Sequence, residues 1–202
     1  MQEAIVFLAK VPPTGSARRT RLCFAIMTYL VAYFAASVAD LVTTKMAIQA
    51  GGKEANVYVT DAGSYLAARA LLLTGVGGVA MAALFAFGHF YADRVAPIFL
   101  EHPITSFGRF YLNPWSRIER SPLHAASYAI AFVALRFLAA GNNICIVVGL
   151  KPPIGTAVRA IGYATTQATG FVLVVGTLYL LLAVVLSPLA ANVIRRSLRM
   201  KY

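Results

Sequence analysis

Residues 22–50 read LCFAIMTYLVAYFAASVADLVTTKMAIQA, a segment in which Asp40 and Lys45 are the only charged side chains. A run this long and apolar is sufficient to cross a hydrocarbon core of about 30 Å as a helix. The basic residues at 18–21 and the small residues at 37–39 are also typical of a signal peptide. However, the apolar pattern continues past Asp40 to Ala50, and we therefore predict a first transmembrane helix over 22–50.

The rest of the chain has the composition of a membrane protein. Apolar residues make up 59% of the 202 residues and charged residues 12%, which is about half the charged share of an average globular protein. Three further apolar runs follow the first, and we expect helices over 65–91, 122–149 and 166–189. The sequence thus predicts an all-α, polytopic membrane protein with four transmembrane helices.

The distribution of positive charge predicts the orientation. A net charge of +11 would favour nucleic-acid binding in a soluble protein, but here the cations lie beside the apolar runs. Twelve Lys and Arg residues fall in three segments, and three fall in the two other connections. By the positive-inside rule we expect a basic cytoplasmic N-terminal segment over 1–21, a cytoplasmic loop over 92–121 and a basic cytoplasmic tail over 191–202. The transmembrane domain would then occupy 22–190 of an inner-membrane protein, with membrane lipid rather than nucleic acid as its partner.

Polar residues inside the predicted spans indicate a candidate site. Tyr33, Ser37, Asp40 and Thr44 fall at i, i+4, i+7 and i+11, which is one face of a helix. Arg136 lies near the middle of the third span, where an unpaired arginine costs about 2.5 kcal/mol or more. We therefore expect it to face the bundle interior, with Asp40, Tyr33 or helix-end carbonyls as partners. The predicted polar cluster comprises Tyr33, Ser37, Asp40, Thr44, Arg136, Asn142 and Asn143, covered by a turn with Glu54 and Asn56. The alternative is that these residues satisfy one another and fix the helix register.

Small residues at helical spacing predict where helices approach closely. The predicted packing positions are Gly75, Gly78 and Ala82 in the second span, and Gly162, Thr166 and Gly170 around the start of the fourth. Packing within one chain and packing between chains both fit this pattern. Prolines mark three further positions. Ser121-Pro122 is expected to start the third helix, and Lys151-Pro152-Pro153 to follow its end. Ser187-Pro188 is expected to kink the fourth helix.

Two histidines are candidate haem ligands. His89 ends the second span and His124 begins the third, so both could lie at one depth. Histidines on neighbouring helices are able to hold a haem, and interfacial histidines facing lipid headgroups are the alternative. The chain has no His-Glu-x-x-His, Gly-x-Ser-x-Gly or phosphate-binding glycine motif. We predict no cofactor, no metal and no catalytic residue.

Residues 40–56 resemble a known motif. Asp40-x-x-x-Thr44 followed by Gly51-Gly52-x-Glu54-x-Asn56 is similar to a pattern in a broad family of small uncharacterised bacterial and archaeal membrane proteins. In that family an Asp-x-x-x-Thr helix end leads into a Gly-x-x-Glu-x-Asn-Pro turn, whereas this chain has Val57 in place of the proline. The resemblance implies a multi-span fold and the location of a site, and it implies no activity.

Three functions remain open from the sequence. The first is a non-catalytic accessory or assembly subunit that packs against other membrane proteins of a larger complex. The second is a small transporter or channel-like protein that uses the intramembrane Asp40 and Arg136. The third is a membrane enzyme or a haem carrier.

Overall fold

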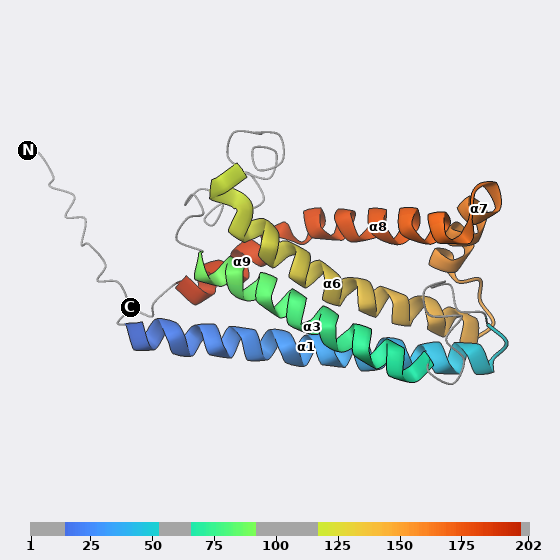
Figure 1. Ribbon diagram of the computed structural model, residues 1–202, viewed down its shortest axis with the longest axis horizontal. Coiled ribbons are helices and arrows are strands. Elements are labelled where there is room, and N and C mark those ends of the chain that lie inside the picture. The colour runs from blue at the N-terminus through green and yellow to red at the C-terminus, as the bar shows by residue number, and fades with distance from the viewer. Residues whose placement is uncertain (1–14, 53–65, 92–116, 199–202) are drawn as a thin grey trace, which may run out of the picture.

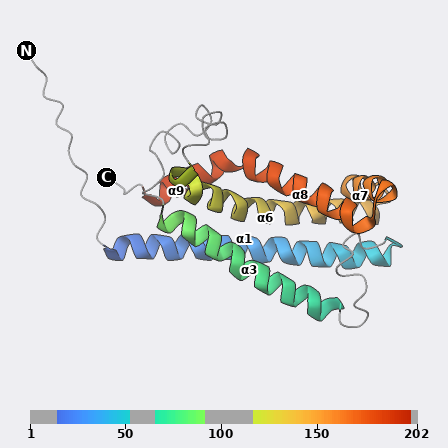
Figure 2. The ribbon, with the colours of Figure 1, turned by 45° about the horizontal axis from the view of Figure 1, so that its top comes forward.

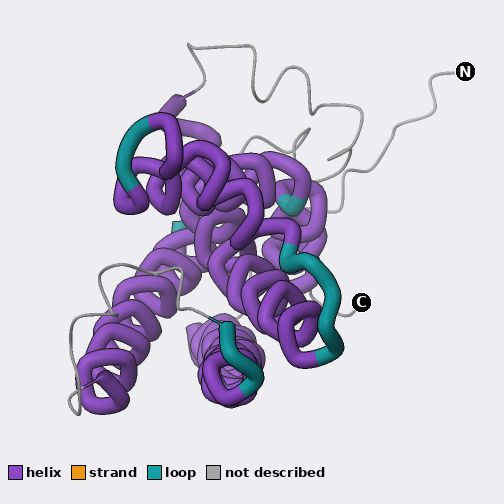
Figure 3. The backbone as a smooth tube through the Cα atoms, turned by 90° about the vertical axis from the view of Figure 1, so that its right-hand side faces the viewer, coloured by secondary structure: helices purple, strands orange, loops and turns teal. Residues whose placement is uncertain are grey.

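The structure, a computed structural model, describes residues 15–52, 66–91 and 117–198. These ranges contain helices and short loops, with no strand among them (Figure 3). The helices, labelled in Figure 1, are α1 (Gly15–Gln49), α3 (Leu66–Phe90), α6 (Arg117–Val147), α7 (Pro153–Ala164), α8 (Gln167–Val185) and α9 (Ser187–Leu198). The all-α prediction is therefore confirmed for the described part of the chain.

Within the described ranges, three helices are long and apolar enough to cross a membrane. They contain the candidate spans Arg19–Gln49, Pro122–Val147 and Gln167–Val185, while Thr74–Phe90 in α3 is a shorter apolar helix. At 1.5 Å per residue, the first span is about 46 Å long, so it extends beyond a hydrocarbon core of about 30 Å or crosses it with a tilt. The chain thus has the helical, apolar character of a membrane protein.

Helix α6 is the central element of the bundle, because it contacts α1, α3, α8 and α9. The core between α1, α3 and α6 contains the buried side chains of Tyr29, Tyr33, Phe85 and Ala129. The Tyr29 and Phe85 rings stack with their centroids 4.6 Å apart. Figure 2 shows α3 crossing α1, with the Leu66 end of α3 diverging from the bundle. Because α3 diverges from α1 toward Leu66, the two helices pack mainly through core side chains such as Tyr29, Tyr33 and Phe85.

The fourth predicted helix is preceded by a separate helix. Residues 154–164 precede the helix predicted over 166–189 and belong to α7, which lies at one end of the bundle and turns back into α8 (Figure 1). A Cβ atom on Gly170 would lie 2.5 Å from the Val158 carbonyl oxygen and 2.8 Å from the Gly162 nitrogen. Only glycine at position 170 therefore allows α7 and α8 to pack this closely, as predicted for Gly162 and Gly170. Thr166 has another role: its Oγ1 accepts a hydrogen bond from the Thr169 backbone N–H (3.1 Å), which caps α8.

Two helix boundaries differ from the predictions. Helix α6 begins at Arg117, and Pro122 lies inside it rather than at its start. The Pro122 carbonyl oxygen lies 2.6 Å from the position of a Cβ on Gly88, so the proline segment packs directly against the backbone of α3. Ser187-Pro188 does more than kink the fourth helix, because α8 ends at Val185 and a new helix begins at Ser187.

The C-terminal segment is part of the core. Residues 191–202 were expected to form a basic tail, but the chain is helical as far as Leu198. Ala190, Ala191 and Ile194 of α9 are fully buried, and α9 contacts α1, α3 and α6. Ile194 follows Ala190 and Ala191 by four and three positions, so all three lie on the side of α9 that faces the bundle. The four cations at 195–201 obscure this apolar face in the sequence.

Candidate functional site: an interhelical polar cluster

An ion pair joins α1 to α6. Arg136 Nη1 lies 3.2 Å from Asp40 Oδ2, and the two side chains are 16% and 21% exposed. The pair is therefore largely removed from the surface without being sealed. Asp40 is on the third turn from the end of α1, and Arg136 is in the middle of the apolar span of α6. Charges in such a setting are stable only when they are paired, because an isolated one would have to be desolvated without compensation.

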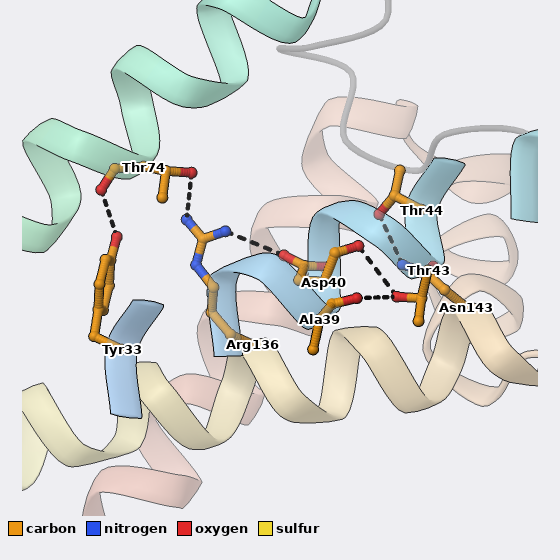
Figure 4. Close-up of polar contacts among 8 residues, drawn as sticks. All are labelled: Tyr33, Ala39, Asp40, Thr43, Thr44, Thr74, Arg136 and Asn143. Carbon is orange, nitrogen blue, oxygen red and sulfur yellow. Dashed lines mark hydrogen bonds and ion pairs between the residues drawn. The ribbon is translucent and has the colours of Figure 1, made fainter. Parts of the chain in front are cut away.

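Arg136 also connects to α3 and to two aromatic rings. Its Nη2 donates a hydrogen bond to Thr74 Oγ1 of α3 at 3.4 Å (Figure 4). Its Cζ lies 5.8 Å from the centroid of the Tyr33 ring and 5.5 Å from that of Phe132. Cation–π contacts at these distances each contribute about 0.5–2 kcal/mol, with larger values where water is excluded. The guanidinium thus ties three helices together.

Tyr33 forms the second connection to Thr74. Its hydroxyl donates to the Thr74 carbonyl oxygen at 2.6 Å, and the side chain is fully buried. A Cβ on Gly78 would lie 2.7 Å from Tyr33 Cε1, so Gly78 provides the space in which the ring lies. The predicted packing role of Gly78 is thus contact between α3 and α1. Ala82, one turn further on, is partly buried against the same core.

Thr44 and the two asparagines form a separate set of contacts nearer the α7 end. Asn143 Nδ2 donates to Thr44 Oγ1 at 2.8 Å, a second link between α6 and α1 (Figure 4). Asn142 lies outside the cluster around Arg136: its Oδ1 accepts from the backbone N–H groups of Ile154 (2.9 Å) and Gly155 (3.3 Å). Asn142 therefore caps the N-terminus of α7. This role could not be predicted from the sequence, because α7 itself was not predicted.

A small hollow lies beside these contacts. It has a volume of about 40 Å³, and its polar lining comes from Thr44, Asn142, Asn143 and Arg159. A water needs about 10–15 Å³ by this measure, so the hollow has room for a few waters or a small polar group. The ends of α1 and α6 and the start of α7 form its walls.

The remaining predicted residues are placed as follows. Ser37 is 1% exposed, and its hydroxyl has no hydrogen-bond partner among the described residues. Gly75 has open space around it, since a Cβ added there would have no atom of the described residues within 4 Å. It therefore takes no part in packing against the described helices. Glu54 and Asn56, the predicted cover of the cluster, lie outside the described residues.

The two histidines lie in different surroundings. His89 is 4% exposed, with Nδ1 3.0 Å from the Phe85 carbonyl oxygen and Nε2 buried with no hydrogen-bond partner in the described part of the chain. His124 stacks on Tyr128, with the ring centroids 6.2 Å apart. Because Nε2 of His89 is already enclosed by protein atoms, this arrangement does not present it to a haem iron. Among the described residues no group of three His, Cys, Asp or Glu side chains is suited to a metal ion.

Thr74 is the residue of this cluster that was not predicted from the sequence. Between Arg69 and His89 it is the only side chain of α3 with a hydroxyl, amide or charge, and that isolation was the available signal. Tyrosine hydroxyls that donate to helix carbonyls were also missed. Tyr29 donates to the Ala129 carbonyl (3.0 Å), and Tyr179 of α8 donates to the Tyr128 carbonyl (3.1 Å). A buried tyrosine usually finds such a partner, but the sequence does not say which carbonyl.

The cluster has the chemistry of a structural link with limited access to water. Its groups are an ion pair, hydroxyls and an amide, and the described contacts join Arg136 to α1, α3 and its own helix. Comparison of the chain with protein-family models, with curated proteins and with solved structures finds no match. The resemblance of residues 40–56 to a family of small membrane proteins therefore stays a prediction.

Proposed function

We propose that this chain is a non-catalytic integral membrane protein that associates with other membrane proteins as an accessory or assembly subunit. Its polar cluster locks three helices together, and its function lies on the outward faces of those helices. Breaking a buried ion pair is far more costly than replacing both partners with apolar residues, which suits a structural lock. The internal contacts of Arg136 support this assignment.

Four spans with both termini in the cytoplasm complete the proposal. Helix α3 has 25 residues, which at 1.5 Å per residue is about 37 Å and long enough for a fourth crossing. The start of α1, the end of α3, the start of α6 and the whole of α9 lie at one end of the bundle in Figure 1. The cation-rich segments of the sequence adjoin these ends, and the positive-inside rule assigns such an end to the cytoplasm.

The observation that carries the proposal is the outward face of α3. Gly75 has open space beside it, and the exposed side chains of Leu72, Val76 and Val79 surround it. Glycine costs up to about 1 kcal/mol in a helix relative to alanine, and this one offers the described helices no packing in return. In a membrane such a position lets a helix of another protein approach closely. Gly78 and Gly88 differ, because other helices of the same chain already cover them.

Two matched variants test the association. In Gly75→Leu the new side chain extends into open space, so the fold is retained and the approach of a partner helix is blocked. Gly141→Leu is the control, because Gly141 also has no described atom within 4 Å but lies on α6, outside the exposed apolar face of α3. We expect partners that co-purify with the tagged wild-type chain in mild detergent to be lost from the Gly75 variant and kept by the Gly141 variant. Equal co-purification with both variants would contradict the proposal.

A transport function is the second candidate, favoured by the partial exposure of the ion pair. Asp40 and Arg136 are 21% and 16% exposed, and the Thr44–Asn143 hydrogen bond and the hollow lie one helical turn beyond Asp40. Intramembrane acids of this kind serve in proton and cation pathways. Proteoliposomes containing the purified chain test this hypothesis. Cation or proton flux that disappears in Asp40→Asn, at an unchanged protein level, would favour transport over the accessory role.

A further inference from the structure

Helix α7 presents a cationic and aromatic face at one end of the bundle. The residues turned away from α8 include Thr156, Arg159 and Tyr163, which fall at i, i+3 and i+7 and so share a face. Tyr163 is 95% exposed. Gly155, Val158 and Gly162, which precede these three residues by one position and so form an adjacent face about 100° away, are buried. Packing of the buried residues against α8 therefore fixes the direction in which Thr156, Arg159 and Tyr163 point.

The position of α7 matches the headgroup level of a membrane. The apolar spans Arg19–Gln49 and Pro122–Val147 end at this side of the bundle, and the span Gln167–Val185 begins there. Helix α7 lies between the second and third of these spans in the chain and at the same end in space (Figure 1). Tyrosine and arginine at the ends of membrane spans are characteristic of the interface, where an aromatic ring is half apolar and half wet.

Among the described residues, the charges at this end are mostly positive. Lys45, Lys151 and Arg159 are all exposed. Asp40 is the only acid described in this half of the bundle, and it is already paired with Arg136. Arg159 makes no hydrogen bond or ion pair with any other described residue. The guanidinium group matches phosphate oxygens bidentately, so the surface is complementary to a negatively charged phosphate.

The hollow beside Arg159 adds hydrogen-bond donors. Thr44 Oγ1 accepts from Asn143 Nδ2, which leaves the Thr44 hydroxyl hydrogen and the second amide hydrogen of Asn143 available. Asn142 Oδ1 is occupied by the two N–H groups of α7, and its own amide group keeps its donors. With Arg159 at the rim, the polar side chains of the hollow offer mainly donors, as an anion requires.

From these observations we propose that the α7 end binds the phosphate of an anionic phospholipid headgroup, with Arg159 as its main ligand, Lys151 beside it and Tyr163 in the interface. The proposal rests on membrane embedding and is independent of the association through α3. In this proposal α7 anchors the bundle in the membrane interface, next to the hollow lined by Thr44 and Asn143.

The test uses the full chain in nanodiscs with a photoactivatable phosphatidylglycerol that reacts near the headgroup. We expect cross-links within 151–163 that are removed by excess unlabelled phosphatidylglycerol and retained with phosphatidylcholine. Arg159→Gln should lower them about fivefold, since one cation near an anionic surface contributes about 1 kcal/mol. Arg159→Lys should keep most of the signal. Arg196→Gln, which changes an exposed arginine of α9 at the opposite end, should leave the α7 cross-links unchanged.

Three outcomes would overturn the proposal. Cross-linking of α7 that is equal in wild type and Arg159→Gln would show that the guanidinium holds no headgroup. Competition by phosphatidylcholine as strong as by phosphatidylglycerol would remove the preference for negative charge. Competition by excess inorganic phosphate as strong as by the lipid would assign the site to a free anion. Loss of α3-dependent partners does not enter this test, so the two proposals fail separately.

Discussion

Replacing the two members of the Asp40–Arg136 pair, singly and together, gives the sharpest prediction. Asp40→Leu leaves the guanidinium with Thr74 at 3.4 Å and two aromatic rings as its remaining described contacts. Arg136→Met leaves the Asp40 carboxyl group without its guanidinium partner. The double variant replaces both charged side chains with apolar ones, so that neither helix carries an unpaired charge.

The magnitudes follow from burial and geometry. Removing one partner of a buried pair costs about 3–5 kcal/mol, and the residual exposure of 16% and 21% places this pair at the low end. We therefore expect a loss of unfolding free energy of about 3 kcal/mol for Asp40→Leu. Arg136→Met should cost about 2 kcal/mol, mostly through the lost cation–π contacts and the hydrogen bond to Thr74. The double variant should also cost about 2 kcal/mol, because the desolvation penalty of the charges disappears with them.

The assay is equilibrium unfolding of the purified chain in mixed micelles of dodecylmaltoside and sodium dodecyl sulfate, followed by helical circular dichroism. These losses correspond to a coupling energy of about 3 kcal/mol between the two sites. Single-variant losses that add to within about 0.5 kcal/mol of the double-variant loss would refute the pairing, since additivity is the behaviour of sites that do not interact.

Three further substitutions test the other helix contacts. Thr44→Val breaks the hydrogen bond to α6 and should lower the unfolding free energy by about 1 kcal/mol; its neighbour Thr43 bonds only its own helix, so Thr43→Val should change the same unfolding curve by less than about 0.5 kcal/mol. Gly170→Ala forces a Cβ against the backbone of α7 and should lower the thermal midpoint, because the free energy of unfolding falls by about 1–3 kcal/mol. In the control Gly176→Ala, the new Cβ meets no described atom within 4 Å, so the midpoint should be unchanged or slightly raised. Asn142→Ala removes the cap of α7 and should speed amide exchange of residues 154–156 relative to wild type, as expected for a cap that contributes about 1 kcal/mol. Unchanged exchange would show that the cap is dispensable.

The parts of the fold that the sequence predicts are those with a strong one-dimensional signal. Long apolar runs predicted α1, α3, α6 and α8, and the small residues Gly78, Gly162 and Gly170 do lie at close helix contacts. The contact between Asp40 and Arg136 was expected because a charged side chain in a membrane span needs a partner. Within the predicted spans, Asp40 was the acidic side chain available to pair with Arg136.

The parts that the sequence did not predict depend on three-dimensional neighbours. Gly75 has the same spacing signal as Gly78 but faces outward, since α3 diverges from the bundle at that end. Asn142 and Asn143 are adjacent in the chain, yet one caps α7 and the other binds Thr44. Ile194 is buried although it precedes a run of cations. In each case the direction of a helix, rather than the residue type, decided the role.

In the proposed function the polar cluster holds the helices together, while association with other proteins uses the exposed surface of α3. To test this division, the Asp40→Leu/Arg136→Met double variant is expressed in place of the wild-type chain, and its membrane level and the size of its native complex are measured by blue-native electrophoresis. We predict a complex of unchanged size, at a level that exceeds that of Asp40→Leu alone. A double variant that accumulates normally but no longer forms the complex, or that loses cation flux, would contradict the proposed division of roles.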